Sequence, residues 1–405
     1  MEQSLISVVM VNYNHEDFIG RAIESVLGQT WKNLEFIIVD DGSTDASPEI
    51  IRQYADRDPR IRPYLQKENN HISYVTNLGL SKVTGSYVAR IDSDDIWCPE
   101  KLERQVQYME AHPEGALCFT KLDIINEKEE IVNDSMMVFY QMYNSRQEDR
   151  RGWIRHFFFY GNSLIQSTLL MKREVVDRIG GFNLAYLQSH DFDYFVRAIR
   201  HFDFIFLEEP LTKYRRTENQ NSAWDEATTR RFLNEHMNIR YHYFDDMSDE
   251  IFTEVFQEDF VKKDSKSHEE LLCEQAFLLC RCIRGEDINP VLGAKKLLDI
   301  MQDPDMLVLL KEKYQFTPKT FYDISIKPMF TTDSIMCELE YLKRLRPMLE
   351  ERVEGLVAAN ETLNRQVGET NKKMKELTEE NQRLKETIHQ IEQTKTWKLR
   401  KLIKH

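Results

Sequence analysis

Three carboxylates lie close together in the stretch RIDSDDIW, residues 90–97, where Asp92, Asp94 and Asp95 follow an apolar run and precede a tryptophan. Like charges this close repel one another, and burying them without partners is costly. Carboxylates on a turn do, however, form a hard oxygen site for Mg²⁺ or Mn²⁺, ions that complete their shell with water and substrate phosphates. The spacing therefore indicates either a solvated turn or a site that receives a cation.

The elements around these acids predict the fold that would position them. Continuous apolar runs predict buried strands at 5–11, 34–40 and 87–92, with amphipathic helical patterns between them. Strand and helix in alternation predict an α/β fold, a parallel sheet with helices on both faces. Ligands of such sheets bind outside the carboxyl ends of the strands. Asp40 and Asp41 end the second run, so we expect them beside the acids of 90–97.

Composition limits the classes of function. The 405 residues are 41% hydrophobic and carry a formal net charge of −14. This is typical of a globular protein and argues against wrapping the nucleic acid backbone, so no nucleic acid partner is expected. No apolar run approaches the roughly 18 residues of a membrane span, and the chain does not open on a signal peptide. We therefore expect a cytoplasmic protein.

A heptad pattern occupies the last part of the chain. From Leu349 to Ile391 the core positions alternate steps of four and three, with asparagine at two a positions, Asn360 and Asn381. Paired a-position asparagines favour a parallel dimer with a fixed register. We expect a homodimer through a coiled coil at 333–393, and a lone helix folded onto the body is the alternative.

The final residues, KTWKLRKLIKH, carry five Lys/Arg and no acid. A basic amphipathic end with an interfacial tryptophan is typical of contact with an anionic membrane surface. The resulting hypothesis is a peripheral location at the inner membrane face, and a solvated basic tail is the alternative.

The chain contains the stretches SVVMVNYN, IIVDDGSTD, NLGLSKVTGSYVARIDSDDIWCPEKL and GGFNLAYLQSHDFDYFVRA in that order. Over residues 5–222 they resemble the successive motifs of the family 2 glycosyltransferases with the GT-A fold. The resemblance implies a Rossmann-like, mostly parallel sheet with flanking helices. It also implies inverting transfer of one sugar from a UDP- or dTDP-sugar to an acceptor hydroxyl, with Mg²⁺ or Mn²⁺ as cofactor. A glycan or lipid-linked acceptor in cell-surface polysaccharide synthesis would suit such an enzyme.

With this resemblance the chain divides into four expected parts. These are a GT-A domain at 1–222, a helical domain at 223–332, the coiled coil at 333–393 and the basic tail at 394–405.

The resemblance assigns five residues to nucleotide binding. Asp41 matches the aspartate that accepts the N3–H of a uracil or thymine ring, and an ionised carboxylate is suited to that because it only accepts. Tyr13 matches a residue that stacks near the base, and Val11 precedes it. Asp92 matches an aspartate close to the ribose and sugar, and Asp94 belongs to the diphosphate motif.

The resemblance also assigns the metal ligands and the base. Asp94 and Asp95 match the metal motif, and Asp191 matches the general base that deprotonates the acceptor hydroxyl. An in-line displacement needs one base on the acceptor side and one cation on the phosphate side. Two structural alternatives stay open: Asp41 before Gly42 can form a turn, and Asp191 can cap a helix.

The chain departs from the common family pattern at three positions. His190 stands where a glutamate usually precedes the base, and His71 stands where a glycine is usual. Thr217 stands where many relatives carry a histidine that reaches the metal or the diphosphate. His190 is therefore a candidate contact to the acceptor, and Arg215 and Arg216 are candidate contacts to phosphate, with solvated arginines as the alternative.

Two other functions stay open. A nucleotidyltransferase would open with a glycine-rich, arginine-containing loop, whereas VNYNHED follows the first strand here. A catalytically inactive GT-A scaffold would act through its coiled coil. Metal-dependent hydrolysis of a UDP-sugar separates the scaffold from the enzyme.

Overall fold

The computed structural model describes residues 3–216, 226–280, 291–325 and 332–393. It divides into two compact units, Met1–Met329 and Phe330–His405. Within the described ranges, no helix combines the length and the apolar character that a membrane span requires.

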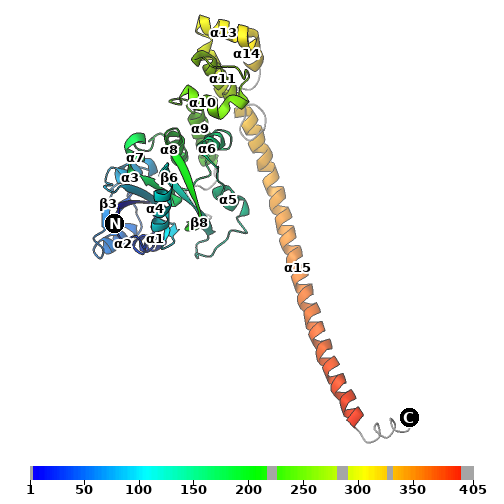
Figure 1. Ribbon diagram of the computed structural model, residues 1–405. Helices are drawn as coiled ribbons and strands as arrows, with labels where there is room; N and C mark the ends of the chain where they lie inside the picture. Colours follow the sequence, from blue (N-terminus) through cyan, green and yellow to red (C-terminus); the bar gives the residue numbers. More distant parts are fainter. Residues whose placement is uncertain (1–2, 217–225, 281–290, 326–331, 394–405) are drawn as a thin grey trace. The chain divides into compact units, whose positions relative to one another are not determined.

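An eight-stranded sheet forms the centre of the first unit (Figure 1). Its strands are β1 (Ile6–Asn12), β2 (Leu34–Asp40), β3 (Ile61–Leu65), β4 (Tyr87–Asp92), β5 (Ile96–Trp97), β6 (Gly115–Ile125), β7 (Leu170–Lys172) and β8 (Asp203–Arg215). Across the sheet the order is β3-β2-β1-β4-β7-β6-β8-β5. The first four strands in this order are parallel, and β6 and β8 are parallel to each other.

The expected α/β fold with a mostly parallel sheet is confirmed, with one difference. Strand β7 runs antiparallel to both β4 and β6, and β5 runs antiparallel to β8, so the sheet is mixed. Strands β7 and β5 have three and two residues. Segments this short carry no periodic signal, which explains why the sequence did not reveal them.

Helices cover both faces of the sheet because alternate residues of its buried strands point to opposite sides. On β1, Ile6, Val8 and Met10 belong to one apolar core, and Val9 and Val11 belong to the other. The first core includes residues of α1 (Ile19–Leu27), α2 (Ser47–Ala55) and α4 (Lys101–Ala111). The second includes residues of α3 (Ile72–Leu80), α6 (Arg150–Phe159), α7 (Arg173–Ile179) and α8 (His190–Ile199). Helix α5 (Met137–Tyr143) and the 3-10 turn η1 (Gln166–Thr168) complete this part.

The segment after β8 is helical, as its amphipathic patterns predict. It contains α9 (Glu226–Tyr241), α10 (Asp249–Phe256), η2 (Gln257–Asp259), α11 (His268–Leu279), α12 (Val291–Ile300), α13 (Pro304–Tyr314) and α14 (Pro318–Ser325). Residues of α9, α10 and α11 join the second core. Sheet and helices therefore share one compact unit, and the expected domain boundary at residue 222 stays a prediction.

The described residues of the second unit form one helix, α15 (Thr332–Gln393), of 62 residues (Figure 1). At 1.5 Å per residue it is about 93 Å long. Nine of its apolar heptad residues are between 49% and 64% exposed, and we call them the apolar stripe: Val353, Leu356, Leu363, Val367, Met374, Leu377, Leu384, Ile388 and Ile391. The coiled coil stays a prediction, and the basic tail lies outside the described residues.

Candidate active site

The carboxyl ends of β1, β2 and β4 lie side by side. In the strand register Asn12 faces Asp40, and Val11 faces Asp92. The sheet therefore brings together the acids that we call the acidic edge: Asp40, Asp41, Asp92, Asp94 and Asp95. Asp40 itself shapes this edge, because it accepts hydrogen bonds from Nδ2 of Asn12 at 2.8 Å and from Oγ of Ser43 at 2.6 Å.

Asp41 is buried at the end of β2. Its Oδ1 accepts the backbone N–H of Asn70 at 2.7 Å. Burial raises the pKa of Asp41, and the N–H groups of Asn70 and His71 oppose that shift. Tyr13, by contrast, is 36% exposed just beyond the end of β1, while Val11 is buried within that strand. An exposed ring near a recessed carboxylate is suited to stacking on one face of a base.

His71 occupies a strained conformation beside Asp41. Its φ of 68° and ψ of 161° at the start of α3 belong to a region that only glycine adopts freely. This explains in physical terms why glycine is the usual residue there.

The turn after β4 places Asp95 inside the protein. Asp95 is 0% exposed, and its Oδ1 accepts the backbone N–H of Arg215 at 2.8 Å. Its Oδ2 has no hydrogen-bond partner among the described residues. Burial, and then the neighbouring Asp94 and Asp92, raise the pKa of Asp95 well above its ordinary value.

Asp94 is half-buried in the same turn. Burial raises the pKa of Asp94, and charge on His15 opposes the shift. Nδ1 of His15 lies 2.8 Å from Oγ of Ser93, which holds the ring at the turn.

Arg215 is buried behind the turn rather than solvated. It is 1% exposed, its Nε donates to the backbone oxygen of Asp94 at 2.8 Å, and its Nη1 donates to that of Asn126 at 2.7 Å. Its guanidinium also lies over the ring of Phe18 at 4.6 Å. These contacts make Arg215 a support of the acidic turn. The phosphate contact expected for it stays a prediction.

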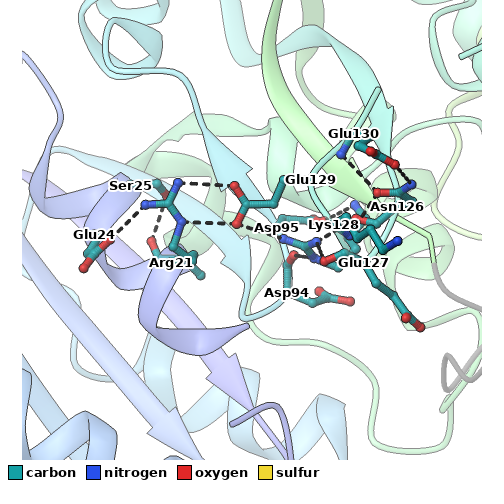
Figure 2. Close-up of polar contacts among 12 residues, drawn as sticks. Arg21, Glu24, Ser25, Asp94, Asp95, Asn126, Glu127, Lys128, Glu129 and Glu130 are labelled. Carbon is teal, nitrogen blue, oxygen red and sulfur yellow. Dashed lines mark hydrogen bonds and ion pairs between the residues drawn. The ribbon is translucent and has the colours of Figure 1, made fainter. Parts of the chain in front are cut away.

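The turn at 126–130 lies beside Asp94 and Asp95, and its Glu129 reaches Arg21 of α1 (Figure 2). The two Oε atoms of Glu129 accept from Nε and Nη2 of Arg21 at 3.1 and 3.2 Å. Three segments far apart in sequence are thus joined around the acidic turn.

Arg216 contacts aromatic side chains. Its Nη1 donates to Oη of Tyr143 at 3.1 Å, and its guanidinium lies 3.9 Å from the ring centroid of Phe139. Its expected phosphate contact also stays a prediction.

Asp191 lies in the first turn of α8 and interacts with the acidic edge. Its Oδ2 accepts from Nδ2 of Asn162 at 3.0 Å, and its Oδ1 accepts the N–H of Phe192 at 2.7 Å. Burial raises the pKa of Asp191 to about 6, with Arg90 opposing the shift and Asp92 adding to it. The N-cap of α8 is Ser189, so Asp191 is not the capping residue.

Through its interactions Arg90 connects β4 with α8 and influences both Asp92 and Asp191. It is buried, and its Nη2 donates to Oδ1 of Asp92 at 3.2 Å. It also influences Asp191, so its positive charge lies near both acids.

His190 uses both ring nitrogens inside the protein. Nδ1 lies 3.1 Å from the backbone oxygen of Leu187, and Nε2 lies 2.9 Å from Nε2 of Gln166. The first contact requires a proton on Nδ1, so Nε2 accepts from the amide of Gln166. Burial lowers the pKa of His190 to about 3, so the ring is neutral at pH 7. Its expected contact with the acceptor stays a prediction and would require these bonds to rearrange.

The acidic turn is compatible with a divalent cation that is only partly held by protein. Among the described residues no cluster of three or more His, Cys, Asp or Glu could hold a metal ion alone. The unpartnered Oδ2 of Asp95 is, however, a carboxyl oxygen, the type of ligand that Mg²⁺ and Mn²⁺ prefer, and a bound cation would favour its ionised form. Water and a diphosphate would then complete the shell. Thr217, the position of the missing histidine, lies outside the described residues.

Three residues of the site were not identified from the sequence. His15 lies beside Asp94, Asn162 contacts Asp191, and Ser167 accepts the N–H of Asp92 at 3.0 Å. His15 closely follows the first strand, so its position was an available signal. The other two lie in a segment without periodicity, and only the fold brings them to the acidic edge.

Comparisons with known proteins identify the family. Residues 7–173 match the model of glycosyl transferase family 2. The chain is 30% identical over 224 residues to an uncharacterized glycosyltransferase of Methanocaldococcus jannaschii, covering 55% of this chain and 74% of that one. It is 42% identical over 105 residues to the putative teichuronic acid biosynthesis glycosyltransferase TuaG of Bacillus subtilis. That match covers 26% of this chain and 42% of TuaG.

Among solved structures, S. aureus TarS 1–349 in complex with UDP-GlcNAc aligns with a TM-score of 0.48 and 17% identity, covering 76% of this chain and 91% of that chain. The sequence relationships, together with the sheet and its acidic edge, lead to one conclusion. The chain belongs to glycosyl transferase family 2 and is a glycosyltransferase.

Proposed function

We propose that this enzyme moves one sugar from a UDP- or dTDP-sugar to an acceptor hydroxyl, with inversion and with Mg²⁺ or Mn²⁺. The observation that carries the proposal is the position of Asp191. This half-buried carboxylate with a raised pKa belongs to α8, yet it interacts with Arg90 and Asp92 of β4. This interaction between distant parts of the sequence supports a site in which Asp191 is the base and the acidic turn holds the cation.

The two sides of this site have different tasks in the displacement. The acceptor oxygen forms a bond to the anomeric carbon while the bond from that carbon to the diphosphate oxygen breaks. Asp191 takes the hydroxyl proton at Oδ1 or Oδ2, and Asn162 and the N–H of Phe192 hold its carboxylate in place. A cation held by Asp94 and Asp95 would supply charge neutralisation of the leaving diphosphate.

The raised pKa of Asp191 is suited to this task. A general base is most effective when its pKa lies near the working pH. At pH 7 a carboxyl with a pKa of about 6 is mostly ionised, yet it is more basic than an ordinary aspartate.

Asp41 supports the choice of uracil or thymine as the nucleobase of the donor. Its recessed carboxylate keeps acceptor capacity beyond the N–H groups of Asn70 and His71 that it faces. An imide N–H, present in uracil and thymine but not in cytosine, would pair with it. Exposed Tyr13 would stack on the same ring.

Calorimetric titration with UDP, dTDP, GDP and CDP, each with and without Mn²⁺, tests this proposal. We expect metal-dependent binding of UDP or dTDP, lost in Asp94→Ala. Asp177→Ala is the matched control, because Asp177 is an exposed carboxylate on α7 that pairs with Arg173. Metal-independent or absent binding would favour the alternative of an inactive scaffold.

The acceptor is proposed from the relatives. The similarity to TuaG supports a glycan or lipid-linked acceptor in cell-surface polysaccharide synthesis. A cytoplasmic enzyme peripheral to the inner membrane face would meet such an acceptor. Flotation with anionic liposomes, comparing the full chain with one ending at Gln393, tests the basic tail as the membrane contact.

The apolar stripe of α15 supports a homodimer. Nine large apolar side chains on one helix are exposed at heptad positions, and burying each would contribute about 1.5–3 kcal/mol. A second copy offers the same stripe in the same register, with Asn360 facing Asn360 and Asn381 facing Asn381. Light scattering of the full chain should therefore give twice the monomer mass of 48.3 kDa.

A further inference from the structure

One carboxylate holds the backbone segment that leads into Asp191. Glu235 of α9 accepts three consecutive N–H groups, those of Leu187 and Gln188 at 2.9 Å each and that of Ser189 at 2.7 Å. Glu235 is only 6% exposed. A buried carboxylate is costly unless hydrogen bonds compensate for its lost hydration, and these three bonds do so. They also fix the path of the chain immediately before α8.

Two neighbours of Glu235 on α9 contact both sides of the same segment. Nδ2 of Asn238 donates to Oη of Tyr186 at 2.8 Å, before the held N–H groups. The ring of His236 stacks on Phe192 at 4.7 Å, directly after Asp191. Helix α9 therefore contacts the chain on both sides of His190 and Asp191, from Tyr186 to Ser189 and again at Phe192.

The chemistry of the contact requires a carboxylate. Only an acceptor with two oxygens can take three N–H groups, and a negative charge there is further favoured by the positive end of α8. A glutamine would turn an N–H₂ group toward backbone N–H donors and lose at least one of the bonds. The segment would then shift, and Asp191 with it.

We propose that Glu235 is a positioning residue for Asp191, so that α9, outside the residues matched by the family model, sets the geometry of the base. The inference rests on the proposed role of Asp191. It predicts that Glu235 affects the transfer step and leaves the nucleotide site on β1, β2 and β4 intact.

The test compares Glu235→Gln with Glu254→Gln, a control that removes one charge from an exposed position on α10. Release of UDP is followed with Mn²⁺ and a panel of UDP-glucose, UDP-galactose and UDP-N-acetylglucosamine. A displacement of about 1 Å costs on the order of 100-fold in rate, so kcat of Glu235→Gln should fall about 10- to 100-fold. The affinity for UDP with Mn²⁺, measured by calorimetry, should stay unchanged, and the control should match the wild type.

A second variant separates positioning from general stability. Glu235→Asp keeps the charge and should recover part of the lost kcat; it also carries the comparison if Glu235→Gln does not fold. Equal losses of UDP affinity and kcat would overturn the proposal in favour of a general structural role. Wild-type kcat in both Glu235 variants would overturn it too.

Asp191→Asn, assayed in parallel, distinguishes a wrong role for Glu235 from a wrong role for Asp191. If that variant stays active, the base is wrongly assigned. If it is inactive while the Glu235 variants are normal, only the positioning role is wrong.

Discussion

The acidic edge of the sheet and the apolar stripe of α15 differ in where their contacts come from. At the acidic edge the chain supplies its own partners: Arg215 supports the turn, Asn162 holds Asp191, and Glu235 holds the segment before it. On α15 the nine residues of the apolar stripe are exposed. The difference teaches that the proposed transfer chemistry depends on contacts within one chain, whereas the stripe would be buried only in the proposed dimer. Changes at one region should therefore leave the other intact.

Replacement of Asp191, the proposed general base, should give the largest effect. Asp191→Asn keeps the size of the side chain but removes the proton acceptor, so UDP-sugar turnover should fall about 10²- to 10⁴-fold. Calorimetry should find UDP binding with Mn²⁺ unchanged, and light scattering should find the same mass as for the wild type. Asp177→Asn serves as the exposed control. Turnover within a few-fold of the wild type would remove Asp191 from the mechanism.

Charges placed in the apolar stripe should weaken the dimer and leave nucleotide binding unchanged. Leu363→Glu combined with Leu377→Glu puts two carboxylates per chain into the expected interface. The dimer dissociation constant, from sedimentation equilibrium, should rise at least about 100-fold, because each lost leucine removes about 1.5–3 kcal/mol of burial. Nucleotide affinity should not change.

The matched control for that pair is Lys372→Glu. It makes the same total change in charge at an exposed position of α15 outside the stripe. Dissociation of the control to the same extent would show that net charge, not the stripe, governs association.

The pH dependence of turnover should report the environment of Asp191. Burial raises its pKa from 3.8 to about 6, with Arg90 and Asp92 as the charged neighbours. Below that pKa the carboxyl is protonated and cannot accept the hydroxyl proton. The kcat/KM for UDP-sugar hydrolysis should therefore rise about tenfold per pH unit up to about pH 6 and then level off. A midpoint near pH 4 would mean that the site is more solvated than its contacts indicate.

The smallest effect is expected at His71. Its backbone conformation costs about 1–3 kcal/mol for a residue with a Cβ. Glycine avoids this strain, but it loses more conformational entropy on folding, which offsets part of the gain. His71→Gly should raise the free energy of unfolding by about 1 kcal/mol, which a thermal melt would record as a rise of about 2 °C. His71→Ala is the control, because it removes the same side chain but keeps the strain. Equal stabilisation by both variants would point to the imidazole rather than the backbone.

The sequence predicted the fold class and the acidic edge because both depend on local patterns. Apolar runs mark β1, β2 and β4, and parallel strands place their carboxyl ends at one edge, so the positions of Asp41 and Asp92 followed from spacing alone. Arg215 shows the limit of this reasoning. An arginine at this position was compatible with exposure to solvent or with a phosphate contact. Only the packing shows that it is buried behind the acidic turn.

By itself the sequence determined the family, the buried strands, the acids at their ends and the heptad pattern of α15, all of which are properties of neighbouring residues. Only the tertiary structure decided which distant groups meet: Asp191 with Arg90 and Asp92, Arg215 with the acidic turn, and Glu235 with the chain before Asp191. The physical reason is that such contacts, and the pKa shifts that follow from burial, depend on how the helices and the mixed sheet pack. No spacing along the chain encodes them.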